Sequence, residues 1–144
     1  MKVPGLRSPR ETVGGIVYFG RLLDKIRLHA QGKLPADYLP NLGKGFDAVS
    51  CGFLKVGYAD LAERVKQGGS DEEILQWCFT KGRKPTDDEI TMLNDYLSKR
   101  GWRDARSTRV AEIKKEYGTS DRDEIQTFFD LIDVDEGRDD AIPS

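Results

Sequence analysis

Residues 70–101, SDEEILQWCFTKGRKPTDDEITMLNDYLSKRG, contain two helix-start signals in succession. In each signal a serine or threonine is followed three residues later by glutamate, at Ser70–Glu73 and at Thr86–Glu89. This arrangement is a capping box: the hydroxyl accepts a hydrogen bond from a free helical N–H, and the glutamate accepts one from the N–H of the capping residue. A glycine follows each apolar run and ends the helix. The stretch therefore predicts two consecutive α-helices.

Five further segments carry apolar residues at three- and four-residue steps, which is the helical period. We expect these helices at Ser8 to Ala30, Phe46 to Leu54, Tyr58 to Gln67, Ser107 to Tyr117 and Ser120 to Ile132. The first begins with a capping box that has proline at the first helical position. No segment shows a sustained alternation of apolar and polar residues, so we predict no strand. The expected fold is all-α, a compact bundle of six or seven short helices with no significant sheet.

The length of the chain, 144 residues, fits one domain with a hydrophobic core of its own. No repeat period, low-complexity tract or long linker divides it. We therefore expect residues 1–144 to form a single helical domain. Flexible ends are expected at about residues 1–7 and 137–144, and the acidic tail after the last helix is expected to be solvated.

The charge of the chain is unevenly distributed along the sequence. Residues 1–58 contain nine Lys or Arg and four Asp or Glu, for +5; residues 59–144 contain fourteen and twenty-one, for −7, and the sum is −2. A net negative charge argues against nucleic acid as a partner. The two halves can attract one another within the fold, or the basic half can face an anion.

The sequence favours a cytoplasmic protein with no membrane segment. No apolar run approaches the 18 or so residues of a membrane span, and the first fifteen residues lack the apolar core of a signal peptide. Cys51 and Cys78 show no CxxC pairing, which favours reduced thiols. We expect no metal, because the acidic end does not match the spacing of an EF-hand. We expect no cofactor either, because the glycines do not form a dinucleotide-binding fingerprint.

Basic residues in the first half are the candidates for anion binding: Arg21, Lys25, Arg27 and Lys44. Lys44 stands between Gly43 and Gly45, ahead of a predicted helix, where flexible backbone N–H groups can hold phosphate or carboxylate. The alternative is that these glycines form a plain turn.

Gly14, Gly15 and Gly20 fall inside the first predicted helix, where each costs about 0.5–1 kcal/mol relative to alanine. Two explanations remain open. The glycines either let another helix pack closely, or they leave room for a ligand beside Tyr18, Arg21 and Asp24.

Catalytic candidates are limited by the single histidine of the chain, His29. With Asp47 and Cys51, one helical turn apart, it could complete a Cys-His-Asp arrangement. The alternative is that His29 caps the end of the first helix or lies on the surface, and that the cysteines are small core residues.

Several long stretches resemble a family of small bacterial proteins described only as a domain of unknown function. These stretches are SPRETVGGIVYFGRLLDKIRLHAQGKLP, NLGKGFD, QGGSDEEILQWCF, KRGWRD and DRDEIQTFFDLIDVDEGR. The resemblance implies a small, soluble, helical protein in a bacterial setting, and it implies no activity, cofactor or catalytic residue.

Two functional hypotheses follow. The first is a non-enzymatic helical module that binds an anionic small molecule or protein partner through its basic half. The second is a small cofactor-independent enzyme with an acid-base or cysteine site beside the first helix. The residues of that site would be Tyr18, Asp24, His29, Asp47 and Cys51.

Overall fold

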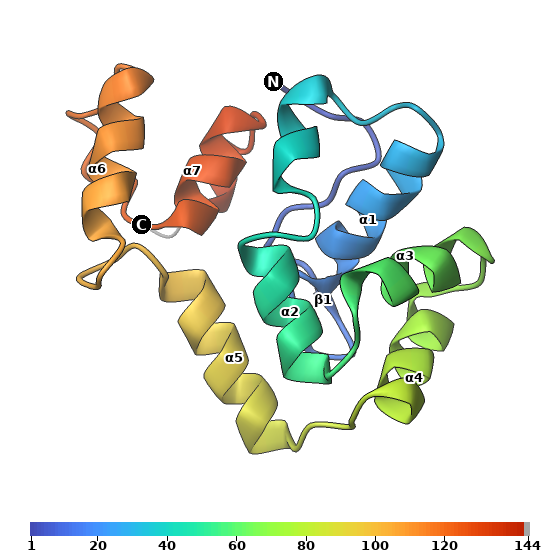
Figure 1. Cartoon of the computed structure of the whole chain (residues 1–144). Helices are drawn as coiled ribbons and strands as arrows, with labels where there is room; N and C mark the ends of the chain where they lie inside the picture. Colours follow the sequence, from blue (N-terminus) through green and yellow to red (C-terminus); the bar gives the residue numbers. More distant parts are fainter. Residues whose placement is uncertain (143–144) are drawn as a thin grey trace.

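The computed structural model describes residues 1–142 and has the predicted all-α class (Figure 1). Seven α-helices, two short 3-10 helices and one two-stranded hairpin occur in the described residues. In chain order the elements are β1 (Thr12–Val13), β2 (Ile16–Val17), α1 (Phe19–Ala30), η1 (Ala36–Asn41), α2 (Phe46–Leu54), α3 (Tyr58–Lys66), α4 (Asp71–Lys81), α5 (Asp87–Lys99), α6 (Ser107–Glu116), α7 (Phe128–Asp135) and η2 (Asp139–Ala141). Within residues 1–142, no helix combines the length and apolar character that crossing a bilayer requires.

The capping boxes that predicted two consecutive helices are formed. The Glu73 N–H donates to Ser70 Oγ at 3.2 Å and the Ser70 N–H to Glu73 Oε1 at 3.0 Å. Thr86 and Glu89 make the same pair of bonds, at 3.2 and 2.9 Å. These bonds satisfy backbone N–H groups that a helix start leaves free. Both predicted helices are therefore confirmed, as α4 and α5.

The first helix starts later than predicted, because the residues before it form a hairpin. Ser8 and Glu11 make the local bonds of a cap, but the chain then turns into β1 and β2, which pair antiparallel with Val13 opposite Ile16. The loop of the hairpin is Gly14-Gly15, whose φ angles are +58° and +78°. A two-residue loop of type I′ needs positive φ at both positions, which glycine adopts readily. The prediction of glycines inside a helix was wrong at Gly14 and Gly15.

The last helix also starts later than predicted. Ser120 does not cap it; the capping box lies seven residues further on, between Thr127 and Asp130. The predicted solvated acidic end is corrected as well, since Asp133 is 0% exposed and Arg10 pairs with both Asp130 and Asp133. Buried carboxylates persist when paired with cations, so this ion network fixes the N-terminal segment against α7.

The main core forms around α1, whose Phe19, Leu22 and Leu23 are 0% exposed. Side chains of α2 to α5 and Phe129 of α7 complete it. Before the hairpin, Val3 and Leu6 pack with Leu28 and Leu34 in a second cluster. At the other end, the predicted flexible segment 137–144 includes residues 143 and 144, which lie outside the described part of the chain.

The arrangement leaves two groups of helices facing one another. Figure 1 shows α1 to α4 on one side, α6 and α7 on the other, and α5 along the edge that links them. The η1 helix continues the first group above α2. α5 packs against β2 and α7, and α6 against α7.

Candidate ligand-binding pocket

A pocket of about 870 Å³ lies between the two groups of helices. Its lining comes from α1, η1 and the start of α2 on one side, and from α5, α6, α7 and their connections on the other. Its basic side chains are Arg21, Lys25, Lys44, Arg100, Arg106 and Arg109. Its aromatic side chains are Tyr18, Tyr38, Phe46, Tyr96, Tyr117 and Phe128. This volume falls within the range of about 300–1,000 Å³ that small-molecule sites occupy.

A buried triad of Lys25, Tyr18 and Asp47 lies at the inner wall of the pocket. The Lys25 amine donates to Asp47 Oδ1 at 2.6 Å and to the Tyr18 hydroxyl at 2.9 Å. The Tyr18 hydroxyl in turn donates to Asp47 Oδ1 at 2.6 Å. Asp47 lies in the first turn of α2, and the Gly43 N–H donates to its second oxygen at 3.0 Å. The triad therefore connects the start of α1, the middle of α1 and the first turn of α2.

Tyr18 is held in an unusual backbone conformation for a tyrosine. It precedes α1 with φ +71°, in the left-handed region. Its ring stacks on Phe129, with the centroids 6.4 Å apart, and meets Phe46 edge to face at 5.6 Å. A residue other than glycine keeps positive φ only where its surroundings determine it. The aromatic packing and the triad supply those surroundings and aim the hydroxyl at Lys25.

Burial shifts the proton equilibria of the triad. It raises the pKa of Tyr18 well above its ordinary value of 10.0, and the nearby Asp47 carboxylate adds to this rise. Burial also lowers the pKa of Lys25 below 10.5, although the Asp47 charge opposes the change. Tyr18 is therefore a protonated hydroxyl at neutral pH, and the Lys25 amine loses its proton more easily than an exposed lysine does.

A second buried ion pair joins the two walls of the pocket. Arg21 of α1 donates to both oxygens of Glu136, which follows α7, at 2.7 Å each. Tyr38 of η1 and Arg138 also donate to the Glu136 carboxylate, each at 2.7 Å. Burial alone would raise the pKa of Glu136, but the hydrogen bonds and charge of Arg21 lower it below 4.5. Glu136 is thus an ionised group whose charge is already neutralised.

The remaining basic residues of the pocket differ in whether an acid neutralises them. Arg100 pairs with Asp104 at 3.2 Å, and Arg109 with Glu112 and Glu116 at 3.1 and 3.4 Å. Among residues 1–142, no carboxylate lies within 4.0 Å of the charged nitrogens of Lys44 or Arg106. The Arg106 guanidinium instead lies over the Phe128 ring, 5.9 Å from its centre. Two cations on opposite walls of the pocket are therefore available to an anion.

Part of the predicted ligand set meets in this pocket. Arg21, Lys25, Lys44 and Gly45 line it, and Gly43 contributes the N–H bond to Asp47. The two loop glycines have φ of +75° and +57°, so they form a turn as well.

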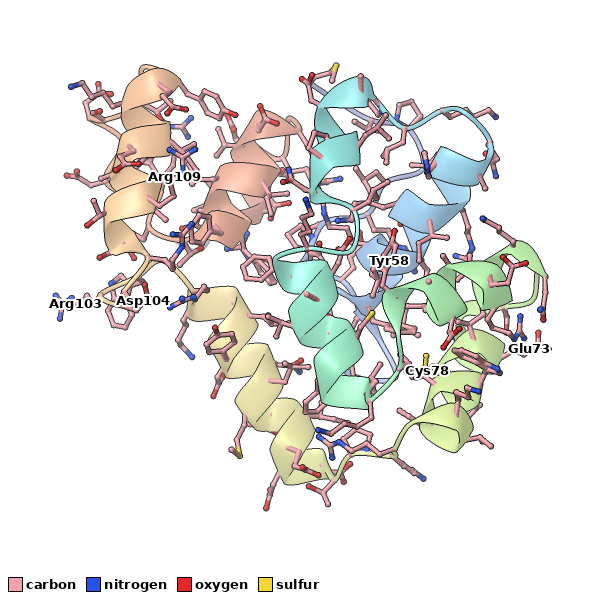
Figure 2. The ribbon with its side chains drawn as sticks, viewed as in Figure 1. Tyr58, Glu73, Cys78, Arg103, Asp104 and Arg109 are labelled. Carbon is pink, nitrogen blue, oxygen red and sulfur yellow. The ribbon has the colours of Figure 1, made fainter. Side chains whose placement is uncertain are left out.

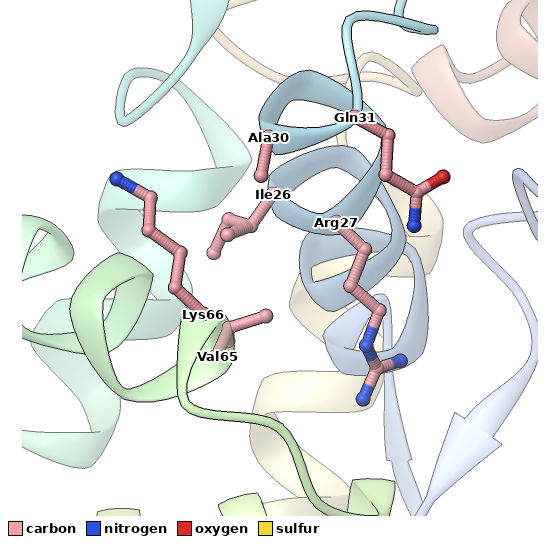
Figure 3. A pocket seen from close by; sticks show the side chains of 6 residues that line it. All are labelled: Ile26, Arg27, Ala30, Gln31, Val65 and Lys66. Carbon is pink, nitrogen blue, oxygen red and sulfur yellow. The ribbon is translucent and has the colours of Figure 1, made fainter.

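Arg27 lies outside this pocket. Its guanidinium pairs with Asp71 at 2.7 Å, and its side chain lines a smaller pocket of about 260 Å³ between α1 and α3 (Figure 3). Asp24 is occupied in the same region, because it accepts bonds from the Arg7 backbone and guanidinium. Asp24 therefore holds the N-terminal segment to α1, and Arg27 holds α1 to α4.

The glycine of α1 serves packing. A side-chain carbon at Gly20 would lie 2.8 Å from the Arg7 guanidinium carbon. The Arg7 side chain also donates to the Gly20 carbonyl oxygen at 3.1 Å. The absence of a side chain therefore lets Arg7 lie across α1 and reach Asp24.

The structure places Asp47 and Cys51 one turn apart in α2 but leaves His29 apart from them. His29 is exposed at the end of α1, whereas Asp47 is 0% exposed and bonds to Tyr18, Lys25 and Gly43. Burial raises the pKa of the Cys51 thiol to about 11, and the Asp47 charge contributes. A thiol with this pKa is not ionised at neutral pH and is a poor nucleophile.

Three arginines of the pocket were missed by the sequence reasoning. Arg100, Arg103, Arg106 and Arg109 recur every third residue, and this regular spacing was the available signal. Figure 2 shows Arg109 on the side of α6 toward α7, and Arg103 at the outer edge of the loop before α6. Arg100 follows α5, Arg106 precedes α6 and Arg109 lies within α6. All three line the pocket.

The chain belongs to the family described as "Domain of unknown function (DUF5069)", whose model matches residues 3–138. The family membership predicted from the sequence is confirmed. A comparison with curated proteins finds no match. In residues 1–142, no group of three or more His, Cys, Asp or Glu side chains is arranged to hold a metal ion.

Proposed function

We propose that this protein is a binding module for a small anionic molecule that has an aromatic or apolar part. The observation that carries the proposal is the 870 Å³ pocket, which combines six basic side chains with six aromatic ones. Three acidic side chains, Asp37, Asp135 and Glu136, also line it, so the cations outnumber the acids. The pocket favours an anion over a cation.

Lys44 and Arg106 are the residues that we assign to the charged group of the ligand. Neither is engaged with an acidic side chain in the described residues, whereas Arg21, Lys25, Arg100 and Arg109 all are. Both side chains are exposed, and an ion pair with an exposed side chain contributes about 0.2–1 kcal/mol. The ligand would therefore gain most from these two side chains.

The rings of the pocket would hold the apolar part of the ligand. Phe46 and Phe128 meet edge to face, with their centres 6.2 Å apart, and belong to opposite walls. Aromatic side chains in a partly enclosed site contribute both buried area and stacking. A concave site of this kind supports a small molecule more than a protein partner, whose interfaces are broader and flatter. The free and buried Cys51 and Cys78 support a cytoplasmic setting for this function.

Thermal denaturation with phenyl phosphate and inorganic phosphate tests the proposal. A ligand at about 100 times its Kd stabilises the folded protein by about 2.7 kcal/mol, which raises Tm by several degrees. We expect phenyl phosphate to raise Tm at lower concentration than phosphate, because only the former uses the rings. Added salt should weaken both effects, since it screens the exposed cations.

Three single substitutions test where phenyl phosphate binds. Lys44→Ala and Arg106→Ala should each weaken phenyl phosphate binding about two- to five-fold, which corresponds to about 0.4–1 kcal/mol. Lys84→Ala removes the same charge from an exposed position in the loop between α4 and α5 and should leave binding unchanged. No Tm shift with either probe, or equal losses in all three variants, would overturn the proposal.

A further inference from the structure

Besides its ion pair with Asp47, Lys25 has a hydroxyl and a pocket beside it. An ion pair that only stabilises the fold needs neither of them. Its side chain is 7% exposed, yet it lines the large pocket. Its amine has a hydroxyl, Tyr18 Oη, at 2.9 Å as well as the Asp47 carboxylate at 2.6 Å. These two bonds use two of the three donor positions of an ammonium group. The Lys25 nitrogen is thus a buried nucleophile with an acid-base pair beside it, on a side chain that lines the pocket.

We propose that Lys25 condenses with the carbonyl carbon of an anionic aldehyde or ketone held in this pocket and forms a protonated imine. This inference rests on the proposed anion-binding function, because Lys44 and Arg106 would hold the anionic group while the carbonyl reaches Lys25. It adds to that function the chemical class of the ligand and a covalent step.

The step balances without an oxidant or reductant. The Lys25 ammonium first gives a proton to Asp47, and the nitrogen lone pair then forms a C–N bond as the carbonyl π bond breaks. A proton moves from nitrogen to oxygen and gives a hydroxyl on the former carbonyl carbon. Protonated Asp47 returns its proton to this hydroxyl, water leaves, and the nitrogen lone pair forms the C=N bond. The net change is ammonium plus carbonyl to protonated imine plus water.

The charge of the site is preserved through the step. The protonated imine carries the same positive charge as the ammonium, so the buried Asp47 carboxylate keeps its counter-charge. One N–H donor remains on the imine nitrogen for the bond to Asp47 Oδ1. Asp47 also keeps its bond from Tyr18, at 2.6 Å, and its bond from the Gly43 N–H, at 3.0 Å. The adduct therefore leaves no buried charge unpaired, which would otherwise be strongly destabilising.

The Tyr18 hydroxyl is positioned to assist proton transfer. It lies within hydrogen-bond distance of both the Lys25 nitrogen and Asp47 Oδ1. Because it accepts a hydrogen bond from Lys25 and donates one to Asp47, the hydroxyl can relay a proton from the Lys25 ammonium to the Asp47 carboxylate. Burial lowers the pKa of Lys25, and each unit of lowering increases the neutral fraction of the amine about ten-fold.

Reductive labelling of the full chain tests the proposal. The probe is pyridoxal 5′-phosphate, an aromatic aldehyde with a phosphate, followed by borohydride and peptide mapping by mass spectrometry. We expect Lys25 to be labelled at least about ten-fold faster than the exposed Lys84, since a pocket that holds the phosphate brings the aldehyde to the Lys25 amine. The labelling rate should rise with pH with a midpoint below 10.5, the ordinary value for lysine. Phenyl phosphate should slow labelling of Lys25 and leave Lys84 unaffected.

Two variants control the interpretation. Lys25→Arg keeps the positive charge beside Asp47 but forms no imine, so the fast adduct should disappear. Tyr18→Phe keeps the ring but removes the hydroxyl beside the Lys25 amine, so it should slow labelling of Lys25. Peptide mapping of the labelled wild-type protein decides the question even if a variant fails to fold.

The outcomes separate this inference from the proposed function. If phenyl phosphate raises Tm but only exposed lysines are labelled, the imine is overturned and the anion-binding function stands. No labelling of Lys25 together with no Tm shift would overturn both.

Discussion

The Arg21 guanidinium and the Glu136 carboxylate form two hydrogen bonds of 2.7 Å, with side chains only 4% and 2% exposed. Arg21 belongs to α1, and Glu136 directly follows α7. The pair therefore connects the central helix to the last one across the base of the pocket. Its loss should affect both the stability of the fold and the shape of the pocket.

Replacement of Glu136 tests the contribution of this pair to stability. Glu136→Gln leaves the Arg21 charge buried without its counter-charge, which should lower the free energy of unfolding by about 3–5 kcal/mol. The control is Asp135→Asn, at an exposed neighbour that also lines the pocket, where we expect a change within about 0.5 kcal/mol. Urea denaturation measures both. Equal effects of the two substitutions would show that the pair does not stabilise the fold.

The ion pair of Arg21 and Glu136 should also make the free energy of unfolding depend on pH in the acidic range. Burial opposes ionisation of Glu136, but the Arg21 hydrogen bonds hold its pKa below the ordinary 4.5. The folded state therefore binds fewer protons than the unfolded state just below pH 4.5, and stability decreases as pH falls through that range. We expect the free energy of unfolding to fall between about pH 5 and 3, and to fall less steeply in Glu136→Gln. Identical slopes in the two proteins would contradict this origin of the acid sensitivity.

Two glycines with opposite environments test the packing of α4 against α2. A side-chain carbon at Gly82 would lie 1.9 Å from the Leu54 carbonyl oxygen, so Gly82→Ala should cost more than about 3 kcal/mol. Gly52 lies inside α2 with no neighbouring atom within 4 Å, and Gly52→Ala should stabilise the protein by about 0.5–1 kcal/mol. Thermal denaturation should show shifts of opposite sign. A mild effect at Gly82 would mean that the two helix ends do not approach so closely.

The hairpin before α1 has a similar matched pair. Gly14 and Gly15 both have positive φ, which costs an alanine about 1–2 kcal/mol. A side-chain carbon at Gly14 would also lie 2.4 Å from Leu75 Cδ2, whereas none lies within 4 Å at Gly15. Gly14→Ala should therefore destabilise the protein more than Gly15→Ala in urea denaturation. Stabilisation by about 0.5–1 kcal/mol in both variants would instead indicate a helix at these residues, as the sequence alone suggested.

The fold could be predicted where local signals decide the structure. The boxes at Ser70 and Thr86 start α4 and α5 because capping depends on residues three positions apart. The same signal at Ser8 failed, because the Gly-Gly loop after it favours a hairpin that packs on Leu75 and α5. A local capping pattern cannot reveal such a tertiary contact.

The candidate pocket could be predicted only in part, for a similar reason. Lys25 and Asp47 were both selected from the sequence, but for different roles, and nothing local indicated that they are 2.6 Å apart. Arg106 comes from a segment 60 or so residues beyond Lys44, and only the packing of α5 on α7 brings it to the same pocket. His29 was selected for its chemistry, yet its place at the exposed end of α1 separates it from Asp47.

The most direct test of the proposed anion-binding function is a backbone amide NMR titration of the protein with phenyl phosphate. Saturable shifts should be concentrated at Lys44, Gly45 and Arg106, which line the large pocket on both walls. Shifts confined to Arg27 and Lys66, in the smaller pocket between α1 and α3, or no saturable shift at any residue, would contradict the proposal.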